Sequence, residues 1–168
     1  MAFNSFLLAY APCLAGKKRK GDISIVADIK QVDVHYLVTL VDTLQVSEGG
    51  NKAGIVSINT ANAIQVDFNQ VASTNETVLL TRIRNNVGKP ESFVSQQNDY
   101  VNALTRVEEL YTRDRHDFRD VLLFVTDATS GIAINPSAFD GLKVIYIILC
   151  TGNLGFYYSQ TILIRPTQ

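Results

Sequence analysis

The sequence lacks the bulk features that mark several large classes of protein. Its 15 lysines and arginines nearly balance its 16 aspartates and glutamates, which gives no overall bias toward nucleic acid or a membrane surface. No apolar run approaches the roughly 20 residues that a membrane-spanning helix needs. We therefore expect no nucleic-acid partner and no membrane span, so that any function must come from a local site.

Familiar catalytic and metal-binding motifs are also absent. The chain has no Gly-x-Ser-x-Gly elbow and no Walker lysine loop. His35 and His116 have no cysteine or histidine at ligand spacing, which favours structural or surface roles. The two cysteines, Cys13 and Cys150, could form one disulfide at most, and the apolar run that ends at Cys150 favours a buried free thiol.

Residues 1–21 are expected to be a leader or linker ahead of the folded domain. Their apolar stretch has about the length of a signal peptide, but it contains Pro12 and its basic residues, 17–20, follow the stretch instead of preceding it. A solvated basic link is favoured over a nucleic-acid patch. The remaining residues, 22–168, are enough for one well-buried domain.

From residue 22 onward, apolar strands alternate with amphipathic helices. The apolar runs within 22–28, 121–125 and 144–150 predict buried strands. Apolar residues at helical spacing follow Asp33, which is a candidate N-cap. The same spacing returns after Ser73 and Glu76, which have the spacing of a capping box. A turn at 60–62 predicts a hairpin. The pattern indicates an α/β fold in three layers, a doubly wound and mostly parallel sheet with one antiparallel edge strand.

This order of elements resembles a von Willebrand factor A domain over about residues 22–152. The stretch "LLFVTDATSG" looks like the family's strand and Thr-Asp-Gly loop, "KAGIVSINTANAIQVDFN" like its central hairpin, and "NALTRVEELYT" like the helix after its second metal loop. The resemblance implies a Rossmann-like adhesion module that binds protein ligands, with an extracellular or secreted location favoured. Domains of the family also end in a C-terminal helix. Pro166 disfavours a helix at the end of this chain, so we expect that helix to be missing. Its absence would suit a piece of a larger multidomain protein.

The resemblance further implies a magnesium site built from three loops. In the family, an Asp-x-Ser-x-Ser loop, a threonine and a second aspartate hold the ion, and a carboxylate of the ligand completes its shell. Asp28 and Asp127 fall on the two aspartates. Lys30 and Val32 replace the serines, and the threonine position falls near Gln97. The motif is therefore degenerate.

We expect the ammonium group of Lys30 to neutralise Asp28 and Asp127 in place of a metal. A unit charge pair at ~4 Å, with an effective dielectric constant of about 20, is worth on the order of 4 kcal/mol before desolvation. Two alternatives stay open at this point. One is weak or remodelled magnesium binding by these vestigial aspartates, and the other is a cleft without a functional role.

The sequence thus predicts a non-catalytic protein-interaction domain without a cofactor. Its ligand would bind at Asp28, Lys30, Gln97 and Asp127. The alternative is a magnesium-dependent enzyme of phosphoryl transfer or hydrolysis that uses the two aspartates, although no nucleophile with a supporting base is visible. Asn75 begins a glycosylation sequon, Asn-Glu-Thr, which is usable only if the chain is secreted.

Two weaker features lie near the C-terminus. The stretch "TGNLG" at 151–155 could cradle a phosphate, although a turn is favoured. Tyr157 and Tyr158 could form an aromatic patch for a partner, although packing against the sheet is favoured.

Overall fold

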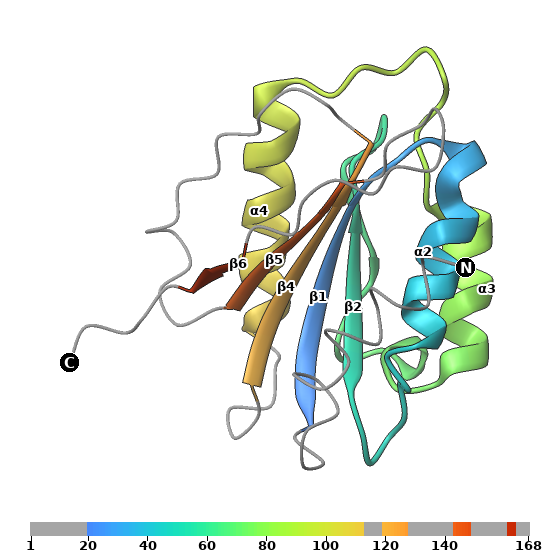
Figure 1. The fold of residues 1–168 in the computed structure, drawn as a ribbon, viewed down its shortest axis with the longest axis vertical. Helices are drawn as coiled ribbons and strands as arrows, with labels where there is room; N and C mark the ends of the chain where they lie inside the picture. Colours follow the sequence, from blue (N-terminus) through green and yellow to red (C-terminus); the bar gives the residue numbers. More distant parts are fainter. Residues whose placement is uncertain (1–19, 113–118, 128–142, 149–160, 164–168) are drawn as a thin grey trace.

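A computed structural model of the chain describes residues 20–112, 119–127, 143–148 and 161–163. Within these ranges the strands form a single six-stranded sheet in the order β3-β2-β1-β4-β5-β6 (Figure 1). Their bounds are β1 (Gly21–Asp28), β2 (Lys52–Ser57), β3 (Ala63–Val66), β4 (Arg119–Thr126), β5 (Lys143–Ile148) and β6 (Thr161–Leu163). The mostly parallel α/β sheet predicted from the sequence is confirmed.

The strand directions correct the prediction at one edge of the sheet. Strands β2, β1, β4 and β5 are parallel to one another, and β3 pairs antiparallel with β2 as the hairpin predicts. A second antiparallel pair joins β5 and β6, so each edge of the sheet carries one antiparallel strand. The apolar pattern of a strand does not indicate its direction, and for that reason the sequence does not reveal this pair.

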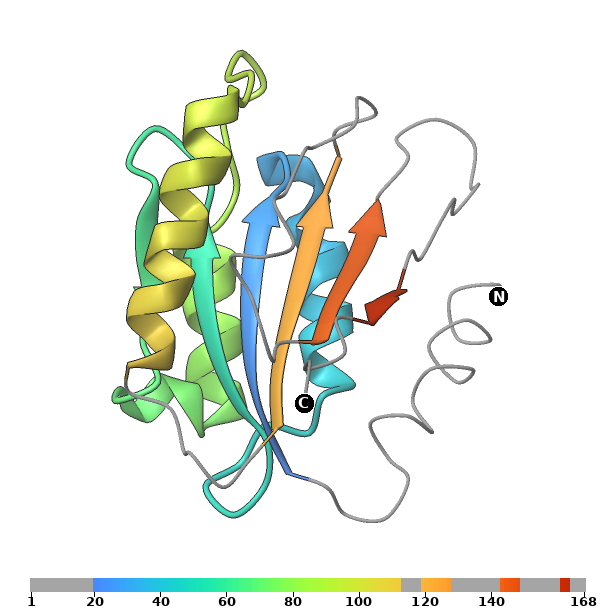
Figure 2. The same ribbon diagram turned by 90° about the vertical axis from the view of Figure 1, so that its left-hand side faces the viewer.

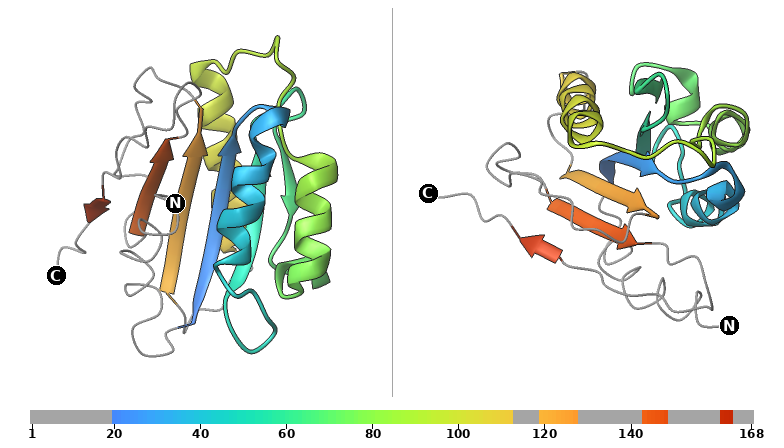
Figure 3. Two further views of the ribbon diagram at one scale, coloured as in Figure 1. Left: turned by 45° about the vertical axis from the view of Figure 1, so that its right-hand side comes forward. Right: turned by 90° about the horizontal axis from the view of Figure 1, so that it is seen from above.

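Helices cover both faces of the sheet, as a three-layer fold requires. Their bounds are α2 (Val34–Asp42), α3 (Glu76–Asn86) and α4 (Gln97–Tyr111), with short 3₁₀ helices η1 (Gln31–Asp33) and η2 (Val71–Ser73). Of the helices that the structure describes, α2 and α3 pack on one face and α4 packs on the other (Figures 2 and 3). None of the helices in these ranges is long and apolar enough to cross a membrane.

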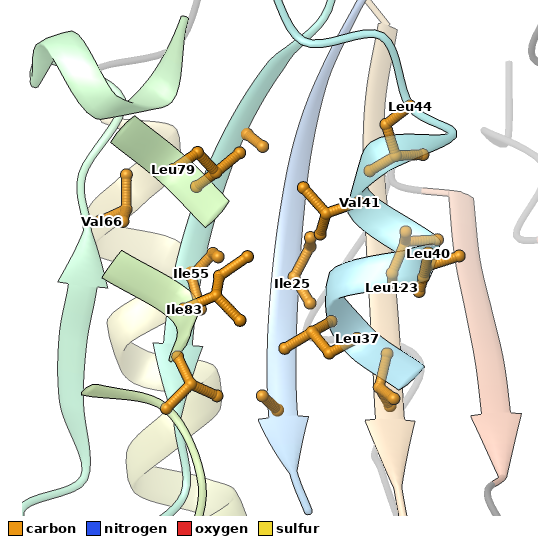
Figure 4. Packing of buried hydrophobic residues seen from close by; sticks show 14 of the residues in the cluster. Ile25, Leu37, Leu40, Val41, Leu44, Ile55, Val66, Leu79, Ile83 and Leu123 are labelled. Carbon is orange, nitrogen blue, oxygen red and sulfur yellow. The ribbon is translucent and has the colours of Figure 1, made fainter. Parts of the chain in front are cut away.

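The alternation of side chains along β1 divides the core into two parts. Ile23, Ile25 and Ala27 face α2 and α3, and in Figure 4 Ile25 lies between Val41 and Leu37. Val26 points to the opposite face and belongs to the cluster that includes residues of α4. Because successive side chains of a strand point to opposite faces, the next residue on the α4 side after Val26 is Asp28. Strand β1 therefore places a carboxylate at the edge of the apolar cluster that packs against α4.

The candidate site lies where the chain changes direction across the sheet. From β1 the chain passes through α2 to β2 on one side, whereas β4 flanks β1 on the other side. The carboxyl ends of β1 and β4 therefore lie at the point where the strand order reverses, which is where ligands bind in open α/β sheets. Figure 2 shows the arrowheads of β1 and β4 side by side at this edge.

Several predictions concern residues outside the described ranges. They are the leader within 1–19, the cysteines Cys13 and Cys150, His116, the turn at 151–155, the tyrosine pair 157–158 and the expected absence of a C-terminal helix. Strand β1 begins at Gly21, one residue before the predicted start of the folded part.

Candidate functional site

The two aspartates picked out by the sequence lie next to each other at the ends of β1 and β4. Asp28 pairs in register with Thr126, and the backbone N–H of Asp127 donates to the carbonyl oxygen of Asp28 at 3.0 Å. The side chain of Asp28 is fully buried and that of Asp127 is 6% exposed. Two carboxylates this close and this deep need compensating positive charge or hydrogen-bond donors.

Four side chains donate hydrogen bonds to the carboxylate of Asp28. The ammonium group of Lys89 lies 2.7 Å from Oδ1, and the hydroxyl group of Ser95 donates to the same oxygen. The other oxygen, Oδ2, accepts from the hydroxyl groups of Tyr100 at 2.9 Å and Thr126 at 2.8 Å. Both carboxylate oxygens are therefore satisfied within the protein.

Lys89 also neutralises the second aspartate. Its Nζ lies 2.8 Å from Oδ1 of Asp127, and the other oxygen of Asp127 accepts the backbone N–H of Lys30 at 3.2 Å. The side chain of Lys89 is only 5% exposed. One buried ammonium group thus bridges the two aspartates.

Backbone hydrogen bonds hold Lys89 in this position. The N–H of Lys89 donates to the carbonyl of Ile29 at 2.8 Å, and the N–H of Gln31 donates to the carbonyl of Lys89 at 3.0 Å. The preceding residue, Gly88, has φ +112°, and a Cβ there would meet the Gln31 side chain at 2.7 Å. Glycine is therefore needed for the turn that lays the α3–α4 loop against the β1 loop.

Electrostatics keep Lys89 charged. Burial lowers the pKa of the lysine, but hydrogen bonds and charges from Asp127 and Asp28 outweigh it and raise the pKa above its ordinary value. The pKa of Tyr100 is also raised, first by burial and then by the negative charge of Asp28. At neutral pH the cluster holds an ammonium ion, and the Tyr100 hydroxyl group keeps its proton.

The structure contradicts the predicted role of Lys30. The Lys30 ammonium group pairs with Glu91 at 3.1 Å on the rim, and its backbone, not its side chain, contacts Asp127. Lys30 follows Asp28 by two residues, but the chain has left the strand by then, so alternation no longer places its side chain beside Asp28. The neutralising lysine is Lys89, from a loop 61 residues further along the chain.

The remaining predicted site residues lie around this cluster. Gln97 is exposed at the first position of α4, and the α3–α4 loop reaches Asp28 through Lys89 and Ser95 instead. Val32 is 62% exposed on η1. Sequence reasoning missed Lys89, Tyr100 and Thr126 as site residues. The pairing of Thr126 with Asp28 could have been inferred from the ends of the two strands. The sequence around Lys89 contains no pattern that indicates its contact with Asp28.

The predicted glycosylation site and the first histidine lie on the surface. Asn75 is exposed and caps α3, because its side-chain oxygen accepts the backbone N–H of Val78 at 3.1 Å. Nδ1 of His35 lies 2.8 Å from the carbonyl oxygen of Val32, consistent with the predicted surface role of this histidine.

The arrangement does not suit a divalent cation. Carboxylates and hydroxyl groups are the oxygen ligands that magnesium prefers, but a charged ammonium group already contacts both carboxylates. In the part of the chain that the structure describes, no three acidic, histidine or cysteine side chains gather as a metal-binding group. A metal ion could enter only if Lys89 moved away.

No family model and no curated protein matches this chain.

Proposed function

We propose that this chain is a non-catalytic protein-interaction domain of von Willebrand factor A type, in which a lysine side chain takes the place of the metal ion. One observation carries the proposal: the ammonium group of Lys89 lies 2.7 Å from Asp28 and 2.8 Å from Asp127, and all three side chains are buried. This ammonium group provides the positive charge that the two carboxylates need at the base of the interaction surface.

The order of the elements supports the type of domain. A strand ending in aspartate, a helix, an antiparallel hairpin, two helices and a second strand leading into aspartate follow one another, as the resemblance implies. The loops after β1, before α4 and after β4 meet through Lys30, Lys89 and Asp127. In the family these three loops carry the ligand-binding surface.

Electrostatics support independence from metal. A divalent ion next to Lys89 would experience repulsion from the ammonium group, and its binding would require this lysine to lose its proton or leave. The raised pKa of Lys89 makes deprotonation costly at neutral pH. Because the lysine is part of the chain, its charge stays at the site whatever the concentration of metal ions.

The same charge state argues against a catalytic role. Ser95 could act as a nucleophile, since its hydroxyl oxygen lies 3.3 Å from the Nζ of Lys89. A lysine serves as a general base only when it is neutral, so a raised pKa works against this pairing. The alternative of magnesium-dependent phosphoryl chemistry would need carboxylates that are already bonded to Lys89.

Calorimetry and an activity screen test the proposal together. Titration of MgCl₂ into the protein should give no saturable heat up to millimolar concentrations. Micromolar magnesium binding that is lost in Asp127→Ala would contradict independence from metal. Turnover of p-nitrophenyl phosphate or other phosphate esters that is lost in Asp28→Asn would contradict the non-catalytic role.

A further inference from the structure

A buried carboxyl group beside the Lys89 cluster has a polar atom without a partner. Asp33 is 5% exposed, and its Oδ2 has no hydrogen-bond partner. It stands at the N-cap position of α2 but makes no capping bond from its side chain. Buried polar atoms normally have a partner, so an isolated one needs an explanation.

The groups around Asp33 give the cluster an excess of negative charge. The charged groups that act on its carboxyl group are Asp127, Glu91, Lys30 and His35. Asp28, Asp33, Glu91 and Asp127 supply four carboxyl groups, and Lys30 and Lys89 supply two ammonium groups, so with His35 counted as neutral the cluster has a formal excess of two negative charges. Burial, and then the charge of Asp127, raises the pKa of Asp33.

Exposed apolar side chains stand on the same two loops. Val32 precedes Asp33 on η1 and is 62% exposed, and Val94 follows Glu91 on the α3–α4 loop and is 72% exposed. The loops are joined by the backbone bond between Gln31 and Lys89 and by the ion pair of Lys30 with Glu91. The site therefore combines an excess of negative charge with exposed apolar side chains at its rim.

On the basis of the proposed function, we infer that the partner is a protein segment that presents an arginine or lysine flanked by apolar side chains. Asp33 and Glu91 receive the cation, and Val32 and Val94 contact the apolar neighbours. The polarity is opposite to that of a metal-containing domain of this type, where the ligand supplies a carboxylate. Binding requires a shift of the single turn η1, which uncovers Oδ2 of Asp33.

A peptide titration followed by NMR tests this inference in the presence of EDTA. The probes are acetyl-Leu-Arg-Leu-amide, its citrulline analogue, which has nearly the same shape without the charge, and acetyl-Leu-Glu-Leu-amide. We expect saturable millimolar binding of the arginine peptide only, with shifts of the amide signals of Val32, Asp33, Glu91 and Val94. The binding should weaken as salt is added.

Matched variants assign the contacts. Asp33→Asn and Glu91→Gln should each weaken the arginine peptide by about threefold or more, as expected for the loss of one charge pair. Glu48→Gln, in the loop between α2 and β2 away from the site, should leave binding unchanged. Equal binding of the citrulline peptide, no binding of the arginine peptide, or an equal effect of Glu48→Gln would overturn the inference. These outcomes do not depend on magnesium, so they are separate from a failure of the proposed function.

Discussion

Replacing Lys89 by methionine removes the charge from the centre of the cluster and keeps most of the side-chain volume. Nζ lies 2.7 Å and 2.8 Å from the two carboxylates. With an effective dielectric constant of about 20, each contact is worth about 6 kcal/mol of Coulomb energy before desolvation. Desolvation of the charges offsets much of this energy. Removing one partner of a buried pair leaves a net loss of stability of about 3–5 kcal/mol.

The contacts that remain favour the lower end of this range. Asp28 keeps the hydroxyl groups of Ser95, Tyr100 and Thr126, and Asp127 keeps the backbone N–H of Lys30. We therefore expect a loss of about 3 kcal/mol. For a chain of this size it corresponds to a fall of roughly 1–2 M in the urea midpoint.

Urea unfolding followed by far-ultraviolet circular dichroism measures this loss, since the chain has no tryptophan for fluorescence. The matched control is Lys30→Met, which breaks a partly exposed ion pair with Glu91 and should cost about 0–1 kcal/mol. If the two variants lost equal stability, or if Lys89→Met were as stable as the natural chain, the bridging role of Lys89 would be refuted.

Two further substitutions test the charges of the site. Lys89→Ala leaves space between the carboxylates and the hydroxyl groups of Ser95 and Thr126, so this variant should gain magnesium binding. Magnesium at a hundred times its Kd should then stabilise the variant by about 2.7 kcal/mol. An unchanged melting temperature in MgCl₂ would contradict this prediction. Asp33→Asn should raise stability at neutral pH by about 0.5–1 kcal/mol, because it removes a buried charge without full compensation. Because the pKa of Asp33 is raised, the folded natural chain binds a proton at this carboxyl group more tightly than the unfolded chain does. The stability gain of Asp33→Asn should therefore shrink as the pH falls toward 3.8, the ordinary pKa of aspartate. Urea unfolding that shows a gain independent of pH would refute this reasoning.

Much of the fold could be predicted because its signals are local. The apolar run before Asp28 marks β1, and the turn before Ala63 marks the hairpin that gives the sheet its first antiparallel edge. The predicted start of α3 was wrong by two residues, because Asn75 and not Ser73 caps the helix. The hydroxyl group of Ser73 donates instead to the carbonyl oxygens of Phe68 and Gln70. Two polar residues close together in the sequence can both fit a capping pattern, and only packing decides between them.

The aspartates of the site could be predicted, but their neutralising lysine could not. Asp28 and Asp127 each follow a buried strand, and parallel neighbours bring such ends together. Sequence proximity suggested Lys30, whereas the observed partner, Lys89, depends on the turn at Gly88 and on backbone bonds to the β1 loop. Such a contact is set by tertiary structure, and one sequence contains no local pattern for it.

A crystal structure grown in MnCl₂, with anomalous data, tests the central claim most directly. Manganese prefers the same oxygen ligands as magnesium and scatters strongly enough to be located. We predict the Lys89 ammonium group between Asp28 and Asp127, without an anomalous peak at this position. A manganese peak bonded to both carboxylates, with Lys89 displaced, would contradict the claim that a lysine takes the place of the metal.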